Sequence, residues 1–185
     1  MSASFLEKIV AYKNKEVHEA RERLPKKRLL EAAGAVKDRL SLASALLGAS
    51  VHIIAENKRA SPSKGIFRPD LDAAQLATSY EEAGASAISV LTDHQFFQGS
   101  PEDLMAAKKA TGLPILCKDF QVSSYKVMEA AAWGADAVLL LARSGCSYAF
   151  GDYLSLGSEF GRESRVGVQT EAELMGGVRV RVGVC

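Results

Sequence analysis

The sequence has few cysteines, no long apolar run and almost no net charge, and each absence excludes a class of protein. Its three cysteines, Cys117, Cys146 and Cys185, are widely spaced and odd in number. They therefore form no disulfide framework, and no Cys/His cluster has the spacing of a zinc site. The longest apolar stretch, Ala137 to Ala142, is far too short to span a bilayer. A net charge of +1 indicates neither nucleic acid nor an anionic membrane as a partner.

The N-terminal residues show no secretion signal. Glu7 and Lys8 interrupt the chain before an apolar segment of signal-peptide length can form. Together with the wide spacing of the cysteines, this predicts a reducing compartment, the cytoplasm. With 185 residues, of which 48% are hydrophobic and 24% charged, the chain suits a globular domain with a sizeable core.

The first segment of the chain predicts a helix. Apolar residues recur at helical spacing from Ser4 to Leu24, with Glu7 three residues after a candidate N-cap at Ser4. Pro25 follows directly after this segment and marks its end.

A second short helix is predicted over Ser41–Leu47, ended by Gly48. The basic run 26–28 between the two helices is interpreted as a solvated turn. We therefore expect residues 1–48 to form a helical extension and residues 49–185 to form the main domain.

From His52 onward, short apolar strands alternate with helices. The sequence predicts strands over 52–57, 85–93, 114–120 and 135–142, and helices over 70–85, 100–112 and 123–134. This alternation predicts βαβ units with a parallel sheet that is buried on both faces. No Gly-x-Gly-x-x-Gly motif follows the first strand, which disfavours a dinucleotide-binding fold. Periodicity alone does not separate a closed barrel from an open sheet.

Charged residues end the first and third predicted strands. Glu56 and Lys58 share one face of the first strand, whereas Asn57 points to the other face. Lys118 and Asp119 end the third strand, so Lys58 and Lys118 should converge at one mouth of the sheet. Burying such charges without partners is costly. We interpret the cluster as a site for an anionic substrate, with a desolvated lysine as general acid; a structural ion pair is the alternative.

Three segments carry a resemblance to a known family. The loop that follows the first strand, Ser61 to Gly65, combines hydroxyl side chains, a cation and a glycine, which predicts a mobile cover over an anionic ligand. This loop belongs to IIAENKRASPSKG, which together with SVLTDHQFFQGS and LPILCKDF resembles successive signature segments of indole-3-glycerol phosphate synthases. The LEKIV start of the first helix is similar to that family's helical segment ahead of its barrel.

The resemblance implies a (β/α)₈ barrel of the TIM type with an N-terminal helical extension. It implies a carboxy-lyase of tryptophan biosynthesis that closes the ring of 1-(2-carboxyphenylamino)-1-deoxyribulose 5-phosphate, with loss of carbon dioxide and water and without metal or cofactor. By this resemblance Lys118 is the general acid, Lys58 binds substrate and assists proton transfer, and Glu56 positions these cations. Ser61 belongs to the substrate-binding loop, and Phe97 of the Phe-Phe pair packs against the aromatic substrate.

The sequence departs from the family pattern in several places. Asn57 stands where the family has an apolar residue facing the helices. In SRVGVQTEAEL, which resembles the fifth strand, Gly167 occupies the place of the family's general-base glutamate. The alternation of Val and Arg in 178–182 predicts a sixth strand, and strands seven and eight of the family pattern are not recognised.

We therefore expect an incomplete barrel of about six strands. Its open sheet edges would favour self-association or binding of a partner chain. One alternative is a catalytically impaired barrel fragment that acts as a binding or assembly module. Another is a different phosphate-binding barrel enzyme, such as a phosphoribosylanthranilate isomerase, although that family does not normally place lysines in E-x-K-R and KDF contexts.

Overall fold

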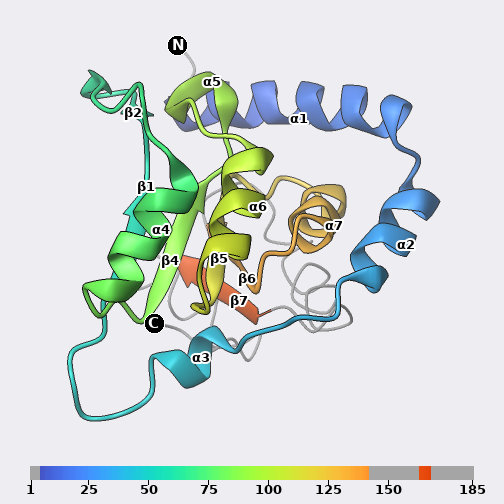
Figure 1. Ribbon diagram of the computed structural model, residues 1–185. Coiled ribbons are helices and arrows are strands. Elements are labelled where there is room, and N and C mark those ends of the chain that lie inside the picture. The colour runs from blue at the N-terminus through green and yellow to red at the C-terminus, as the bar shows by residue number, and fades with distance from the viewer. Residues whose placement is uncertain (1–4, 142–162, 168–185) are drawn as a thin grey trace.

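A computed structural model describes residues 5–141 and 163–167, with the exception of the side chain of Val166 (Figure 1). The helices are α1 (Phe5–Arg23), α2 (Lys26–Ala35), α3 (Leu42–Ala45), α4 (Ala73–Glu82), α5 (His94–Phe97), α6 (Pro101–Ala110) and α7 (Ser124–Ala132). The strands are β1 (Ile54–Asn57), β2 (Ala60–Ser61), β3 (Gly65–Ile66), β4 (Ala87–Leu91), β5 (Ile115–Lys118), β6 (Ala137–Leu141) and β7 (Glu163–Gly167). None of these helices is both long enough and apolar enough to cross a membrane.

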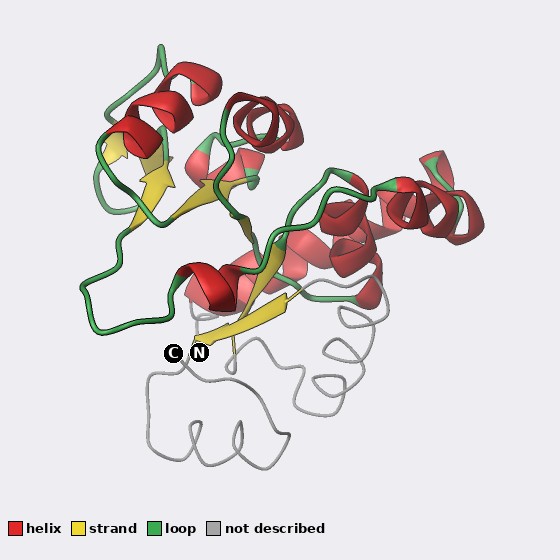
Figure 2. Cartoon of the chain, turned by 60° about the horizontal axis from the view of Figure 1, so that its bottom comes forward, coloured by secondary structure: helices red, strands yellow, loops and turns green. Residues whose placement is uncertain are grey.

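Within the described residues, five strands form a parallel sheet in the order β1-β4-β5-β6-β7. Helices α4, α6 and α7 connect successive strands and cover one face of the sheet (Figures 1 and 2). Strands that pair in chain order, with helices on one side, are the arrangement of a (β/α) barrel. The described part is therefore an α/β fold consistent with an incomplete TIM barrel, as the sequence predicts. The predicted strand at 178–182 lies outside the described residues.

The core lies between the sheet and its helices. Strand β4 is buried on both faces, as predicted, whereas the residues of β1 alternate between partly buried and buried. All five residues of β4 are buried, and its Ile88 and Val90 pack with Ile115 and Cys117 of β5. From the helices, Leu104 of α6 joins the same cluster. Burial on both faces thus explains why the sequence of β4 is almost continuously apolar, as predicted.

Polar residues at the helix ends set the lengths of the crossover helices. The carboxylate of Asp72 accepts hydrogen bonds from the backbone at the start of α4, and the hydroxyl of Ser100 does the same for α6. Gly84 and Gly134 follow α4 and α7 with φ angles of 85° and 93°. Such left-handed backbone favours glycine, so these residues end the helices as the sequence predicts.

Helices α1 and α3 lie at opposite ends of the sheet. Helix α1 lies across the end at which β2 and α5 are found, which is the C-terminal end of the strands (Figure 1). The hydroxyl of Tyr125 in α7 ties α1 in place by donating to the carbonyls of Ala20 and Leu24. Helix α3 lies at the other end, where Leu42 packs against the first residues of β4 and β6, Ala87 and Ala137.

Three elements differ from the sequence predictions. Residues 26–28, predicted as a solvated turn, form the exposed first turn of α2, which buries only Leu29 and Ala33. A stripe of two buried apolar residues is too weak a signal to distinguish a helix from a turn. Helix α5 and the β2–β3 hairpin were also not predicted, and the predicted N-cap at Ser4 lies outside the described residues.

Asn57 is buried against helix α4, on the face of β1 away from Glu56. Its amide nitrogen donates to the carbonyl of Ala73 at 3.2 Å. Its Oδ1 is buried and has no hydrogen-bond partner among the described residues. Only one of the two polar atoms of the Asn57 amide therefore has a hydrogen-bond partner among the described residues.

We expect Asn57→Val to raise the free energy of unfolding by about 1 kcal/mol, because it removes a buried, unsatisfied amide oxygen and suits a strand. Urea unfolding followed by circular dichroism measures the change. Asn57→Asp is the matched control, because it places a charge at the same site and should destabilise the protein. A lower stability for Asn57→Val than for the unchanged chain would contradict this expectation.

Candidate functional site

Glu56 holds two lysines together at the C-terminal end of the sheet. Its Oε1 accepts a hydrogen bond from Nζ of Lys58 at 2.5 Å, and its Oε2 accepts one from Nζ of Lys118. In the parallel register Glu56 pairs with Ser89 of β4, and Ser89 pairs with Leu116, two residues before Lys118. Side chains of the same parity face the same side. The lysines therefore converge as their strand positions predict.

The electrostatics of this cluster favour ion pairs. Burial opposes the charge of Glu56, but hydrogen bonds and charges of Lys118 and Lys58 outweigh it and lower the pKa of Glu56. The expectation of a desolvated lysine is wrong, because the side chain of Lys118 is 40% exposed and that of Lys58 is 31% exposed. Both lysines lie where the strands end, and this end of the sheet leaves their ammonium groups in contact with water.

A cavity of about 250 Å³ lies next to this cluster. This charged cavity is lined by Ile54, Glu56, Ser89, Leu116, Lys118, Leu139 and Arg165. Arg165 of β7 adds a cation that was not predicted as part of the site. The strand alternation could have identified it, because Arg165 and Gly167 flank Val166 and therefore lie on the face of the strand that the family pattern assigns to the site.

A second cavity, of about 140 Å³, shares Lys118 and Leu139 with the first. This aromatic cavity is lined by Leu91, Asp93, Phe97, Lys118, Asp119, Phe120, Leu139 and Leu141. The rings of Phe97 and Phe120 lie 6.3 Å apart, centroid to centroid. Phe96 turns away and makes edge-to-face contacts with Phe5 and Tyr12 of α1. Of the Phe-Phe pair, therefore, Phe97 lines the cavity and Phe96 anchors α1.

Ser61 lies in the short β2–β3 hairpin that follows Lys58. Its hydroxyl accepts a hydrogen bond from the backbone of Lys64 at 3.3 Å and so stabilises the turn. Ser61 is not among the residues that line either cavity. The hairpin does reach the cluster through Phe67, whose ring centroid is 6.0 Å from Nζ of Lys58.

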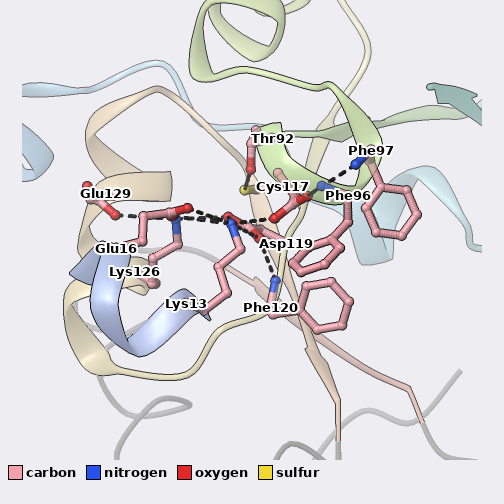
Figure 3. Close-up of polar contacts among 11 residues, drawn as sticks. Lys13, Glu16, Thr92, Phe96, Phe97, Cys117, Asp119, Phe120, Lys126 and Glu129 are labelled. Atoms are coloured by element: carbon pink, nitrogen blue, oxygen red, sulfur yellow. Dashed lines mark hydrogen bonds and ion pairs between the residues drawn. The ribbon is translucent and has the colours of Figure 1, made fainter. Parts of the chain in front are cut away.

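A second ionic cluster lies behind the site, between α1, α7 and the ends of β4 and β5 (Figure 3). Nζ of Lys13 lies 2.8 Å from Asp93 and 2.9 Å from Asp119, and Nζ of Lys126 lies 2.8 Å from Asp119. Glu16 contacts both lysines, at 3.1 Å and 3.0 Å. This cluster was not predicted from the sequence, because its members come from four separate segments and no local spacing connects them.

Burial and charge act against each other in this second cluster. Burial disfavours ionised Asp119, but Lys126 and Lys13 outweigh it and lower the pKa of Asp119. Burial likewise disfavours charged Lys126, and Asp119 and neighbouring glutamates raise its pKa. Burial, together with the charge of Asp119, raises the pKa of the Cys117 thiol to about 12. Cys117 is therefore a core residue and no nucleophile at neutral pH.

The fold and the site together define a (β/α)-barrel protein with a cationic site at the C-terminal ends of its strands. Within residues 5–141 and 163–167, no three His, Cys, Asp or Glu side chains are grouped to hold a metal ion. The sequence model of indole-3-glycerol phosphate synthase matches residues 6–183. The chain belongs to this family.

Named relatives agree with this assignment. The chain is 42% identical over 175 residues to an indole-3-glycerol phosphate synthase of Syntrophobacter fumaroxidans, a match that covers 93% of the chain and 66% of the relative. It is 59% identical over 90 residues to that of Neisseria meningitidis, covering 49% and 35%. The chain thus spans about two thirds of the length of the Syntrophobacter relative. A mandelate oxidase variant with (S)-mandelic acid shares the fold alone, with a TM-score of 0.55 and 16% identity over 89% of this chain and 60% of that chain.

We expect Asp119→Asn to lower the free energy of unfolding by about 3–5 kcal/mol at pH 7, because it leaves buried lysines without their main partner. The pH dependence has a definite sign, since the pKa of Asp119 is lowered from 3.8 by folding. Its contribution is complete above pH 3.8 and is lost as the pH falls from there through the folded pKa.

Urea unfolding at pH 7 and along a series down to pH 3 measures both effects. The exposed Asp70 provides the control, since Asp70→Asn should change stability by less than about 0.5 kcal/mol. Equal stability of Asp119→Asn and the unchanged chain at pH 7 would contradict the assigned ion pairs.

Proposed function

We propose that the protein catalyses ring closure of 1-(2-carboxyphenylamino)-1-deoxyribulose 5-phosphate to indole-3-glycerol phosphate, a cytoplasmic step of tryptophan biosynthesis. The observation that carries this proposal is Glu56 between Lys58 and Lys118, with a charged cavity and an aromatic cavity meeting at Lys118. An anionic aromatic substrate needs both cations and an apolar wall. The family membership of the chain supports the same reaction.

Lys118 is the proposed general acid. It lines both cavities, so a substrate ring packed on Phe97 would bring its carbonyl oxygen near the ammonium of Lys118. When the ring carbon that bears the carboxylate attacks the carbonyl carbon, that oxygen gains negative charge and takes a proton. Loss of carbon dioxide restores the aromatic ring. The hydroxyl then takes a proton and leaves as water while a base removes a proton from the neighbouring carbon of the new ring. Lys58 stabilises the anionic groups, and Glu56 holds both lysines in place.

The roles of Phe97 and Ser61 are also proposals. Phe97 is supported by its place in the aromatic cavity beside Phe120. Ser61 is supported by its hairpin, which begins two residues after Lys58 and reaches that lysine through Phe67. Because Ser61 lines neither cavity, its contact with a phosphorylated substrate requires the hairpin to move toward the site.

Gly167 favours a second candidate function, a barrel with impaired catalysis. Gly167 ends β7 on the same face as Arg165 and carries no side chain that could accept a proton. A Cβ atom at Gly167 would lie 3.0 Å from Cδ2 of Leu141, so a larger residue requires only that this side-chain end shift slightly. The acid side of the proposed site is present, and the base expected at this strand is absent.

We therefore expect weak or no turnover by the chain as it stands, and a rate at least about 10²-fold higher for Gly167→Glu, because a positioned base contributes that much. Indole-3-glycerol phosphate fluorescence measures the rate. Gly167→Gln is the matched control, because it has the same size and cannot act as a base. Turnover by the unchanged chain at about 1–10³ s⁻¹ would contradict the expectation and indicate a substitute base.

In the Gly167→Glu background, we expect Lys118→Ala to lower kcat by about 10²–10⁴-fold, because it removes the proposed proton donor. The same fluorescence assay measures the loss. Lys109→Ala, at an exposed lysine of α6, is the control and should leave the rate unchanged. Full activity of Lys118→Ala would overturn the assignment of the acid.

We also propose that the chain self-associates along β1. Among the described strands β1 pairs only with β4, and the segment leading into it exposes Leu47, Val51 and Ile53 by 73%, 92% and 59%. An apolar segment beside an open strand edge favours contact with another chain. In sizing chromatography we expect elution above the monomer mass of 19.8 kDa, and a shift toward monomer for Val51→Lys. A folded monomer at all concentrations would contradict this proposal.

A further inference from the structure

We propose that Lys13 of α1 is a positioning residue of the site, whose buried ammonium holds the segments that carry Phe97 and Lys118. Lys13 lines neither cavity and has no place in the proposed chemistry. The inference rests on the proposed function and deepens it, because it assigns a role in catalysis to the N-terminal helix.

The ammonium of Lys13 joins two carboxylates that follow neighbouring strands. Lys13 is fully buried, and its Nζ lies 2.8 Å from Oδ2 of Asp93 and 2.9 Å from Oδ1 of Asp119. Asp93 lies two residues beyond β4, and Asp119 lies directly beyond β5. Figure 3 shows Lys13 reaching from α1 toward Asp119, on the side of it away from Phe97. One cation thus connects α1 to the ends of both strands.

The first connection leads to Phe97. The Oδ1 atom of Asp93 accepts hydrogen bonds from the backbone nitrogens of Phe96 and Phe97, at 2.5 Å and 3.2 Å. Asp93 is thus the N-cap of α5, the helical turn that carries Phe97 into the aromatic cavity. With one oxygen on α5 and the other on Lys13, the carboxylate fixes the turn relative to α1.

The second connection leads to Lys118. Asp119 accepts a hydrogen bond from the backbone nitrogen of Phe120 at 2.7 Å, while Lys13 and Lys126 hold its oxygens. This bond holds the peptide unit between Asp119 and Phe120, and on the other side of Asp119 the carbonyl of Lys118 accepts a hydrogen bond from the backbone nitrogen of Thr92 at 3.3 Å. Lys118 and Phe120 both line the aromatic cavity.

This arrangement is better explained by orientation than by stability. Replacing buried ion pairs by apolar residues of similar volume is often neutral or stabilising, so a core gains little from charging Lys13. An apolar side chain would fill the same space but would not direct the carboxylates of Asp93 and Asp119. A misplacement of about 1 Å can cost about 10²-fold in rate, so holding these two carboxylates in a fixed orientation can affect catalysis.

The test compares variants that separate charge from folding. Lys13→Met removes the cation but leaves buried carboxylates unpaired. The double variant Lys13→Met with Asp93→Asn also removes the negative charge of Asp93, and asparagine remains a good N-cap for α5. Lys13→Arg keeps the cation and is the rescue variant. Lys15→Met is the matched control on the same helix, where the lysine side chain is 76% exposed.

Turnover is measured in the Gly167→Glu background. We expect the double variant to lose at least about tenfold in kcat, with a smaller rise in KM, because Lys118 is misplaced relative to the substrate carbonyl while α5 stays capped and Lys58 still binds the anionic groups of the substrate. Lys13→Arg should recover part of the loss, and Lys15→Met should show none. The fluorescence of Trp133, the one tryptophan of the sequence, reports that each variant is folded. An unchanged kcat in a folded double variant would overturn the proposal.

A second readout does not depend on the proposed reaction. Hydrogen exchange at the amides of Phe96, Phe97 and Phe120 reports the backbone bonds to Asp93 and Asp119 directly. We expect faster exchange at these amides in the double variant, because a capped turn and a strand end that Lys13 no longer holds open more often, and unchanged exchange in Lys15→Met. If no variant turns over substrate, the proposed function fails, and exchange alone decides the role of Lys13. Unchanged protection at the three amides would then overturn it.

Discussion

The buried carboxylate of Asp119 is the constraint on which much of this structure depends. Its desolvation is costly, and only the ammonium groups of Lys13 and Lys126 outweigh that cost and keep it ionised. Those lysines come from α1 and α7, so the pairing fixes how the N-terminal helix lies across the end of the barrel (Figure 1). It also fixes the end of β5, where the proposed acid is found.

Lys118 and Asp119 follow each other at the end of β5 and have different roles, because their side chains point to opposite faces of the strand. Lys118 faces the cavities, where Glu56 pairs with it and water still reaches it. Asp119 also lines the aromatic cavity, but its carboxylate is buried against Lys13 of α1 and Lys126 of α7. A cation that must meet a substrate is thus accessible, while the charge that holds its backbone is buried. Strand alternation produces this division without any special geometry.

Asn57 and Gly167 both depart from the family pattern, but they concern different properties of the protein. Asn57 lies on the helix-facing side of β1, where a donor to Ala73 satisfies half of its amide, and it affects packing alone. Gly167 and Arg165 lie on the cavity-facing side of β7. There the chain has a cation, and Gly167 carries no side chain that could act as the proposed base, so this departure concerns the proposed chemistry rather than the fold.

The sequence by itself determined the α/β fold and the convergence of Lys58 and Lys118 at one end of the sheet, because these follow from local periodicity and from the geometry of parallel strands. The barrel order of the strands and the place of Glu56 between the lysines were expected from the family resemblance. The sequence also identified Gly167 as a departure, since that strand has a recognisable pattern. It did not reveal α2, whose buried stripe is only Leu29 and Ala33. Only the tertiary structure decided that Lys118 is accessible, that Phe97 rather than Phe96 lines a cavity, and that Lys13 meets Asp93 and Asp119. Those features depend on packing between segments far apart in the chain, which no local spacing records.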